Sequence, residues 1–433
     1  TQSATDMNRM FYRTSANSVT GLGDLNTSSV TTMSQMFNNA SGGVVNQASE
    51  TLATKMVSGV LRWDVNNVVN FNNMFQDANS LSDTTFPTNW NITSDGSKTV
   101  SMSTMFGGTP NGLTGVTNLD AFATKTINET WYGGTSYTAW NMSRVSSLSQ
   151  FAYASGGGPV SRNYNIASWQ ISSALTNMYY MFGGKSGGNG SVWQQDVGHW
   201  DVSGLDDGPN KVSYWLSARN GNSPPNMATS IYDSILDVTD GWGSQTGTAG
   251  FPTNISWQNG NSQYTPGNIY EGGQGINTYQ TNKIYNGNID LRIYVSVGDV
   301  VERDPDPNGV FDTYAVITGF VAGDPRYATT QGNIGPANYK VMDSDAAKGR
   351  VALILAGWNI TDGGAYIPFD SVEMTINVNA GDTFSISPQN SPNNFKVDWG
   401  DGNGFVGDPN HGGANYTGSG FTATSPAYAS GGN

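Results

Sequence analysis

Apolar residues recur along the first half of the chain in one short phrase, V-x-x-M-x-x-M-F, separated by polar and glycine-rich stretches. Clear copies end at Phe11, Phe37, Phe75, Phe106 and Phe182, and weaker copies lie at Val116–Ala123 and Val145–Ala152. The phenylalanines at positions 11, 37, 75, 106, 122, 151 and 182 are 16 to 38 residues apart, and the gap of 16 belongs to a weak copy that need not be a full unit. Repetition near 30 residues predicts stacked units, because one such phrase cannot bury its apolar side alone.

A second apolar phrase, led by tryptophan, comes shortly before several copies, at Trp63, Trp90, Trp140, Trp169 and Trp200. One unit is therefore roughly W-D-V-S-x-V-x-x-M-x-x-M-F, followed by a turn rich in Gly, Asn and Ser. We predict that Val, Met, Phe and Trp of successive units fill one continuous core, while the intervening polar residues face solvent. We interpret the tryptophans and the Met-Phe stripe as core and not as a sugar-binding or cofactor-binding surface.

Other patterns follow the repeats. Trp200–Asn220 is a degenerate unit, and Asn226–Val238 has apolar residues at helical spacing, which predicts a short helix that begins a cap on the array. Ile289–Val297 and Phe311–Val321 alternate and are rich in β-branched residues, so both are predicted strands, with a turn at D-P-D-P-N-G between them. Three further strands are predicted near the end of the chain, at Val372–Val378, Gly381–Ser387 and Phe395–Gly402.

Composition narrows the class of protein. Charged residues make up only 12% of the 433 residues, but 12 Trp, 17 Phe and 20 Tyr supply the aromatic mass for a core that disordered chains lack. The formal net charge of −14 argues against binding to nucleic acids or to anionic membrane surfaces. The chain has no cysteine, which excludes disulfides and thiolate chemistry, and no apolar run long enough to cross a bilayer.

The unit W-D-V-S…V-T-x-M-x-x-M-F resembles the repeats of BspA-like surface proteins, a variant of the leucine-rich-repeat class found in bacterial surface lipoproteins and phage structural proteins. Arrays of that family tend to end in three phrases: Y-D-x-x-L, G-N-S-x-Y-T-x-G, and A-x-x-A-R-x-x-L…G-W-x-I-T-D-G-G. This chain has matching phrases in that order at Tyr232–Leu236, Gly260–Gly267 and Ala346–Gly364, with Gly349 where the pattern has alanine. The resemblance covers about 1–267 and 340–365 and implies a repeat array with a C-terminal cap.

The resemblance and the strand patterns divide the chain into four segments. Residues 1–267 are predicted to form the repeat solenoid and the start of its cap, 268–339 a β-rich insert, and 340–368 the end of the cap. Residues 369–433 contain V-D-W-G-D-G and resemble the opening of an immunoglobulin-like module of the PKD kind, but a full sandwich needs about seven strands. The predicted fold class is therefore mainly β: a repeat solenoid with short helical turns, followed by a β-rich insert and a partial β-sandwich.

Candidate chemistry is sparse. The best candidate for metal binding is the acidic turn of the insert, with Asp304, Asp306, Asn308 and Asp312. These residues match the first half of an EF-hand calcium loop, but its twelfth position is Ala315 and strands flank it, so the segment is either a calcium site or a plain hairpin turn. His199 and His411 are far apart in turn-rich sequence, and we interpret both as solvated. We therefore predict no enzymatic activity and no cofactor other than this calcium.

These observations predict a structural or adhesive protein that is extracellular, on a cell surface or on a virion. Its array would be a rigid spacer, and its β-modules would contact other subunits of a homo-oligomer or filament, or a host glycan or protein. The alternative is a carbohydrate-binding or polysaccharide-cleaving appendage such as a phage tail fibre. Both ends look cut, so either the chain is a fragment of a longer protein or neighbouring subunits complete the open ends of a filament.

Overall fold

The structure, a computed structural model, separates the chain into two units, Thr1–Ile367 and Pro368–Asn433. It describes residues 3–16, 19–40, 52–78, 89–92, 98–108, 119, 126–127, 137–153, 165–183, 195–213, 215, 227–267, 269–272, 284–285, 288–289, 296–304, 313–320, 328–331, 338–366, 385–386, 397–398, 405–406 and 423–424.

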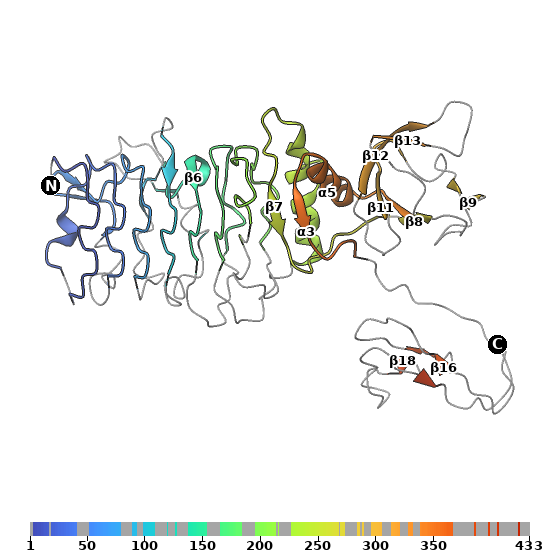
Figure 1. The fold of residues 1–433 in the computed structure, drawn as a ribbon. Coiled ribbons are helices and arrows are strands. Elements are labelled where there is room, and N and C mark those ends of the chain that lie inside the picture. Colours follow the sequence, from blue (N-terminus) through green and yellow to red (C-terminus); the bar gives the residue numbers. More distant parts are fainter. Residues whose placement is uncertain are drawn as a thin grey trace. The chain divides into compact units, whose positions relative to one another are not determined.

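The repeats of the first unit lie side by side as parallel coils (Figure 1). Single parallel bridges join Asp6 to Thr32, Thr32 to Asn70, Asn70 to Ser101, and Ser147 to Asn177. Between them, β3 (Val100–Ser101) pairs in parallel with β6 (Val145–Ser147). Backbone hydrogen bonds repeat this step at the phenylalanines, where Phe11, Phe37 and Phe75 donate to Met36, Met74 and Met105, each at 2.9 Å. Successive coils therefore pair through equivalent residues.

Two tight turns per coil explain the polar residues between the apolar ones. Gln35, Asn73 and Thr104 have φ between 56° and 58°, and the turn four residues later has Asn39, Asp77 or Gly108 in the left-handed region. Asn, Asp and Gly tolerate that conformation best. The aspartate of the W-D-V-S phrase has a matching role, because Asp64 and Asp201 accept hydrogen bonds from the N–H groups two residues later.

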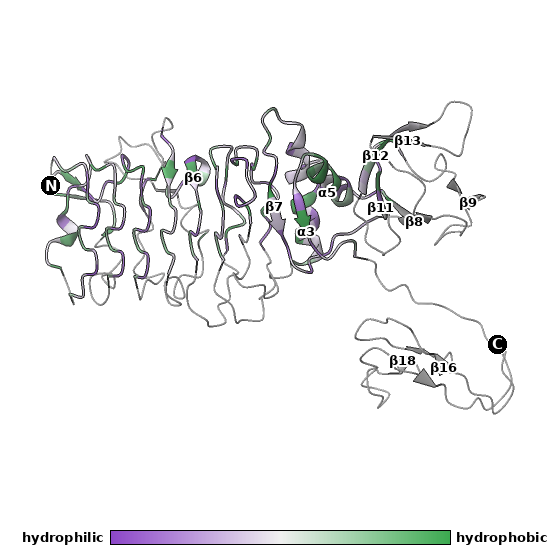
Figure 2. Cartoon of the chain, in the orientation of Figure 1, coloured by the Kyte–Doolittle hydropathy of each residue, from purple (hydrophilic) through white to green (hydrophobic). Residues whose placement is uncertain are grey.

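Aromatic rings fill the core of the array as predicted. Phe11, Phe37, Phe75 and Phe106 form a stack with centroid distances of 5.4 to 5.6 Å and interplanar angles of 7° or less. Trp63, Trp90 and Trp140 form a second stack with 6.0 and 5.7 Å between centroids. All five repeat tryptophans are at most 3% exposed. Hydrophobic and hydrophilic residues follow one another within single coils (Figure 2).

The weak copy at Val145–Ala152 is present, but its Phe151 does not take the position of the other repeat phenylalanines. Phe106 N–H donates to the carbonyl of Phe151, and Phe75 N–H donates to that of Met105, so the position of Phe106 is taken by Ala152 in the next coil. Phe151 occupies the preceding methionine position, and its ring meets Phe106 at 85° instead of stacking. The coil after Phe106 is thus the one at Val145–Ala152, and of the weak copy Val116–Ala123 only Leu119 lies in the described part. Leu119 instead accepts a hydrogen bond from the Trp169 indole.

Short helical turns and strand pairs lie between the bridged segments of the array. They are the 3-10 turns η1 (Leu22–Asp24) and η4 (Met142–Arg144), a hairpin of β1 (Lys55–Val57) with β2 (Val60–Arg62), and a pair formed by β4 (Thr126–Ile127) and β5 (Tyr137–Thr138). The described part of the array therefore consists of bridges and turns more than of long strands. The prediction of a mainly β fold is supported only in this loose sense, with little helix and small sheets.

A cap of mixed structure follows the array. The predicted helix is present as α3 (Thr229–Leu236), followed by η5 (Trp242–Gly247) and β7 (Ser256–Gln258). After the insert, α5 (Asp345–Leu355) begins at Ser344, whose hydroxyl accepts from Ala347 N–H, and β15 (Asn359–Thr361) pairs in parallel with β7. Trp242, Trp257 and Trp358 pack against one another in the cap core. The cap thus adds two more parallel rungs and covers one side with helices.

Gly349 replaces the alanine of the resembling family pattern because α5 crosses α3 at that point. A Cβ built on Gly349 would lie almost on the carbonyl oxygen of Leu236. We expect Gly349→Ala to lower the free energy of unfolding by about 1–3 kcal/mol, because two packed helices would have to separate. Chemical denaturation should show this loss. Gly247→Ala is the matched control, since nothing lies within 4 Å of a Cβ there; an equal loss in both variants would contradict the steric explanation.

The insert contains a five-stranded antiparallel sheet in the order β13 (Ala328–Gln331), β12 (Thr313–Phe320), β11 (Val300–Asp304), β14 (Asn338–Met342) and β8 (Ile269–Gly272). A small hairpin joins β9 (Ile284–Tyr285) to β10 (Asn288–Ile289). The predicted strand at Phe311–Val321 is present as β12. The prediction for Ile289–Val297 is wrong at its end, since Val297 lies in a turn and the strand β11 begins at Val300; residues 290–295 are outside the described part.

Buried side chains lie on both faces of the sheet where β12, β11 and β14 pair. Val300, Val316 and Met342 are paired across three strands and pack against the cap core. Val301, Ala315 and Val341 form the next row, with their side chains on the opposite face and at most 4% exposed. The insert therefore has its own core and also shares one with the cap.

The second unit has two short antiparallel pairs, β16 (Ser385–Ile386) with β19 (Ala423–Thr424), and β17 (Val397–Asp398) with β18 (Phe405–Val406). The predicted strands at Gly381–Ser387 and Phe395–Gly402 each contain one of these strands, and Val372–Val378 lies outside the described residues. The PKD-like sandwich stays a prediction.

Candidate functional site

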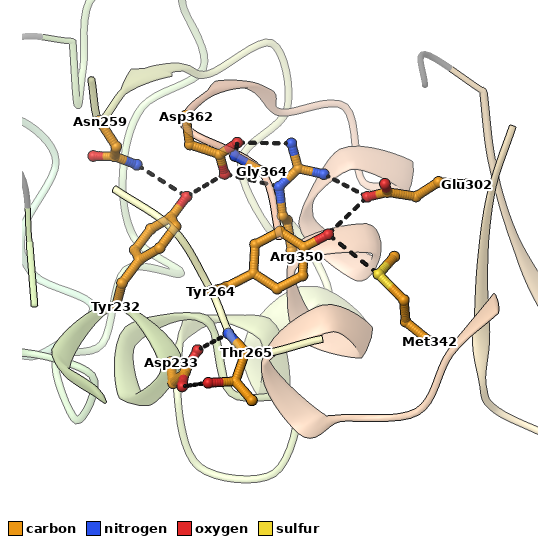
Figure 3. A network of polar contacts seen from close by, with 10 residues as sticks. All are labelled: Tyr232, Asp233, Asn259, Tyr264, Thr265, Glu302, Met342, Arg350, Asp362 and Gly364. Atoms are coloured by element: carbon orange, nitrogen blue, oxygen red, sulfur yellow. Dashed lines mark hydrogen bonds and ion pairs between the residues drawn. The ribbon is translucent and has the colours of Figure 1, made fainter. Parts of the chain in front are cut away.

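A buried polar cluster lies where the cap meets the insert (Figure 3). Its members are Tyr232 of α3, Asn259 after β7, Tyr264, Glu302 of β11, Arg350 of α5 and Asp362 after β15. Arg350 and Glu302 are only 6% and 8% exposed. Charged side chains are rarely buried to this extent unless they are paired. We call these six residues the Arg350 cluster.

Arg350 is the centre of the Arg350 cluster. Its guanidinium makes a bidentate contact with Asp362, from Nε to Oδ2 at 2.8 Å and from Nη2 to Oδ1 at 3.1 Å. Its Nη1 donates to Glu302 Oε1 at 3.0 Å. The planar fork of arginine suits two carboxylates in this way better than a lysine could. One cation thus joins the last turn of the cap to the insert sheet.

The tyrosines complete the carboxylate contacts. Tyr232 Oη donates to Asp362 Oδ2 at 2.6 Å and accepts from Asn259 Nδ2 at 3.3 Å. Tyr264 Oη donates to Glu302 Oε1 at 3.0 Å. Asp362 Oδ1 also accepts from Gly364 N–H at 3.0 Å. Because the buried carboxylates are paired and hydrogen-bonded, their desolvation is offset within the cluster.

Aromatic rings enclose the guanidinium. The Arg350 Cζ atom lies 5.4 Å from the Tyr264 ring centroid and 5.6 Å from that of Tyr314. Tyr314 is opposite Glu302 in the pairing of β11 with β12, so one cross-strand pair of the insert supplies both a carboxylate and a ring. Cation–π contacts strengthen when water is excluded. Arg350 therefore contacts both members of one cross-strand pair of the insert sheet.

A second ion pair supports the same junction. Lys348 Nζ of α5 lies 3.2 Å from Asp299 Oδ1, whose side chain is 2% exposed. The two ends of the insert are also tied together, because the Pro266 carbonyl accepts from the N–H groups of Asp343 and Ser344, both at 3.3 Å. Asp233 of α3 accepts two hydrogen bonds from Thr265, at 2.7 and 2.6 Å. The insert thus leaves and rejoins the cap at one point.

Burial changes the titration of this cluster. Burial and then the charge of Asp362 raise the pKa of Tyr232 well above its ordinary value, and burial and then Glu302 do the same to the pKa of Tyr264. Burial raises the pKa of Tyr314 as well, against the opposing charge of Arg350. Burial disfavours the charged guanidinium, but the charge and hydrogen bonds of Asp362, together with Tyr264 and Glu302, outweigh it and keep the pKa of Arg350 above its usual range. The stable state has neutral phenols and a charged arginine.

Stability should fall in alkaline solution for this reason. The folded pKa of Tyr232 and Tyr264 lies above the unfolded value of about 10. Their contribution is complete below pH 10 and is lost as pH rises above it, because only the unfolded chain then releases the phenolic protons, at up to about 1.4 kcal/mol per pH unit for each tyrosine. Denaturation curves between pH 8 and 11 measure the slope. Tyr232→Phe should make the slope shallower; an unchanged slope would contradict the assignment.

The predicted calcium residues fall mostly outside the described part. Asp304 is the last residue of β11, and Asp306, Asn308 and Asp312 belong to the turn that is not described, so the calcium site stays a prediction. Among the described side chains, no group of three or more His, Asp and Glu could hold a metal ion. His199 is exposed, and one ring nitrogen lies 2.9 Å from the Trp169 carbonyl oxygen. His411 is outside the described residues.

Sequence reasoning did not single out the Arg350 cluster, although the signal was present. Tyr232, Tyr264, Arg350 and Asp362 all lie in the three cap phrases. The phrases appear as end signals of an array, and their polar residues converge because the rungs and helices of the cap bring three distant segments together. Glu302 has no such signal, since it lies in the insert that departs from the pattern.

Comparison with known proteins supports the repeat part of this interpretation. Residues 1–119 and 117–210 match the family model described as Mycoplasma protein of unknown function, DUF285. This match supports the similarity to BspA-like surface-repeat proteins for the array. No curated protein and no solved structure matches the chain. None of the described helices combines the length and hydrophobicity needed to cross a bilayer.

Proposed function

We propose that this chain is a non-enzymatic structural or adhesive protein of a cell or virion surface. Its repeat array serves as a stiff spacer, and its insert and C-terminal unit contact other subunits or a host molecule. The observation that carries the proposal is the series of described coils, each hydrogen-bonded to the next, with stacked aromatic rings in their core. The series ends in a cap that buried ion pairs join to the insert.

Two properties of the molecule support a spacer over a catalyst. Repeat arrays of this kind are stabilised by contacts between neighbours, which favours length and stiffness. The acidic residues gathered in the Arg350 cluster are buried and already paired, so they offer no accessible acid or base. The match to a family that includes surface-repeat proteins agrees with a location outside the cell.

The stiffness can be tested with spin labels, since the chain has no natural cysteine to interfere. Met10→Cys and Leu355→Cys place labels on residues that are 46% and 49% exposed, near opposite ends of the array and cap. We expect one narrow distribution of distances between the two labels. A second pair, Met56→Cys with Leu355→Cys, gives a shorter reference distance within the same array. A broad distribution of distances between the labels at positions 10 and 355 would contradict the spacer role.

The surface location can be tested by adding protease to intact cells or virions, which should cleave the protein if it lies on their surface.

A further inference from the structure

Two arginines and a tyrosine form a cluster in the first described coil. The Cζ atoms of Arg9 and Arg13 lie 5.5 and 5.0 Å from the centroid of the Tyr12 ring. Both arginines are exposed, and Tyr12 is half-buried. The Tyr12 ring therefore contacts two guanidiniums on the surface of a chain with a net charge of −14. We call Arg9, Tyr12 and Arg13 the Arg-Tyr-Arg cluster.

The two positive charges have no carboxylate within ion-pair distance among the described residues. Arg9 donates from Nε to the Gln35 side-chain oxygen, which is neutral, and Arg13 contacts the Tyr12 ring. The acidic residue nearest in sequence, Asp6, accepts from the Asn8 N–H. Two exposed guanidiniums around one ring, with no counterion among the described residues, raise the local positive potential and favour a bound anion.

The backbone conformation at Arg9 and Arg13 is one that arginine seldom adopts. Arg9 and Arg13 have φ of 59° and 56°, in the left-handed region. At the position of Arg13, the next three coils have Asn39, Asp77 and Gly108, which suit that conformation. A residue that is less suited to its backbone than its counterparts points to a function for the side chain. The charge, and not the turn, explains this arginine.

We propose that the Arg-Tyr-Arg cluster binds the carboxylate of a sugar acid at the end of an otherwise neutral glycan. Guanidinium groups match planar carboxylates through paired N–H donors. The net charge of −14 repels polyanions such as nucleic acids and anionic membranes, whereas the two arginines around Tyr12 attract a single anionic group. The inference rests on the proposed adhesive function and names the class of ligand that the array would recognise.

The test uses the whole chain and two methyl glycosides, glucuronide and glucoside, that differ by the carboxylate. Titration followed by NMR should show binding of the glucuronide and no binding of the glucoside. Arg9→Asn and Arg13→Asn remove the charges but place a residue that the left-handed turn favours, as Asn73 and Asn39 do in other coils. Each variant should bind the glucuronide about tenfold more weakly or worse, with an unchanged or higher Tm.

Arg144→Asn is the control, because Arg144 lies elsewhere on the array and donates to the backbone carbonyl of Lys98. It should leave glucuronide binding unchanged. Glucuronide binding that survives both asparagine variants, or no binding in the unaltered chain, would overturn the proposal. Binding of inorganic phosphate as tight as binding of the glucuronide would also overturn it, because the site would then accept any small anion. Self-association that sedimentation detects and that Arg13→Asn abolishes would overturn it too, because the ligand would then be a second copy of the chain. None of these binding results depends on the stiffness or the surface location of the chain. The spin-label and protease experiments therefore test the spacer proposal independently of the ligand proposal.

Discussion

Replacing Arg350 with methionine should lower the free energy of unfolding by about 3–5 kcal/mol, because the change leaves two buried carboxylates without a cation. Asp362 and Glu302 would keep their tyrosine donors but lose three charge-assisted hydrogen bonds. The loss should appear first at the junction of cap and insert. Hydrogen exchange followed by mass spectrometry should therefore show faster exchange in α5, β11 and β12, while the coils of the array keep their protection.

Two further variants identify the cause. The triple change Arg350→Met, Glu302→Gln and Asp362→Asn removes all three charges, so it should recover part of the lost stability. Arg144→Met removes an arginine whose side chain donates to a backbone carbonyl, and it should cost less than about 1 kcal/mol. If Arg350→Met and Arg144→Met are equally stable, the buried ion pairs do not hold the cap and insert together.

Replacing Trp90 with alanine should cost about 3–5 kcal/mol and should divide the array at one coil. Trp90 is fully buried between Trp63 and Trp140, at centroid distances of 6.0 and 5.7 Å. Its indole N–H also donates to the Leu52 carbonyl at 2.6 Å, which would lose its partner. Because each coil contacts only its neighbours, a cavity at this rung weakens both interfaces.

Denaturation monitored by fluorescence should then show two transitions instead of one, as the segments on either side of the cavity unfold separately. Met56→Ala is a suitable control, since Met56 is 42% exposed on the hairpin β1–β2 and should change stability by less than about 0.5 kcal/mol. A single transition with unchanged midpoint in Trp90→Ala would show that the tryptophan stack is dispensable.

The stacking of repeats could be predicted from the sequence because one period of apolar residues determines one burial pattern. Val30, Met33, Met36 and Phe37 are completely buried, as their phrase indicated. The register at Val145–Ala152 could not be predicted, because Phe is bulky enough to mark either of two adjacent core positions. The hydrogen bonds from Phe106 N–H to the Phe151 carbonyl and from Ala152 N–H to the Met181 carbonyl show that Ala152 takes the phenylalanine position.

The cap and insert were predicted less completely for a different physical reason. The helix α3 and the strand β12 have local patterns of their own, and both were expected. The strand β11, with the sequence V-V-E-R-D, has charged residues where a sheet face would be apolar. Glu302 is acceptable there because Arg350, some fifty residues later in the chain, neutralises it. A buried charge with a distant partner has no local signature, so the Arg350 cluster could not be derived from periodicity.

The closeness of the two ends of the insert has an evolutionary consequence. Pro266 receives hydrogen bonds from both Asp343 and Ser344, so a segment of more than seventy residues interrupts the cap without displacing it. A compact module with neighbouring termini fits this junction if it presents a carboxylate to Arg350 and an apolar face to the cap core. The scaffold of array and cap therefore restricts few positions of the insert, and the rest of its sequence can change without altering that scaffold.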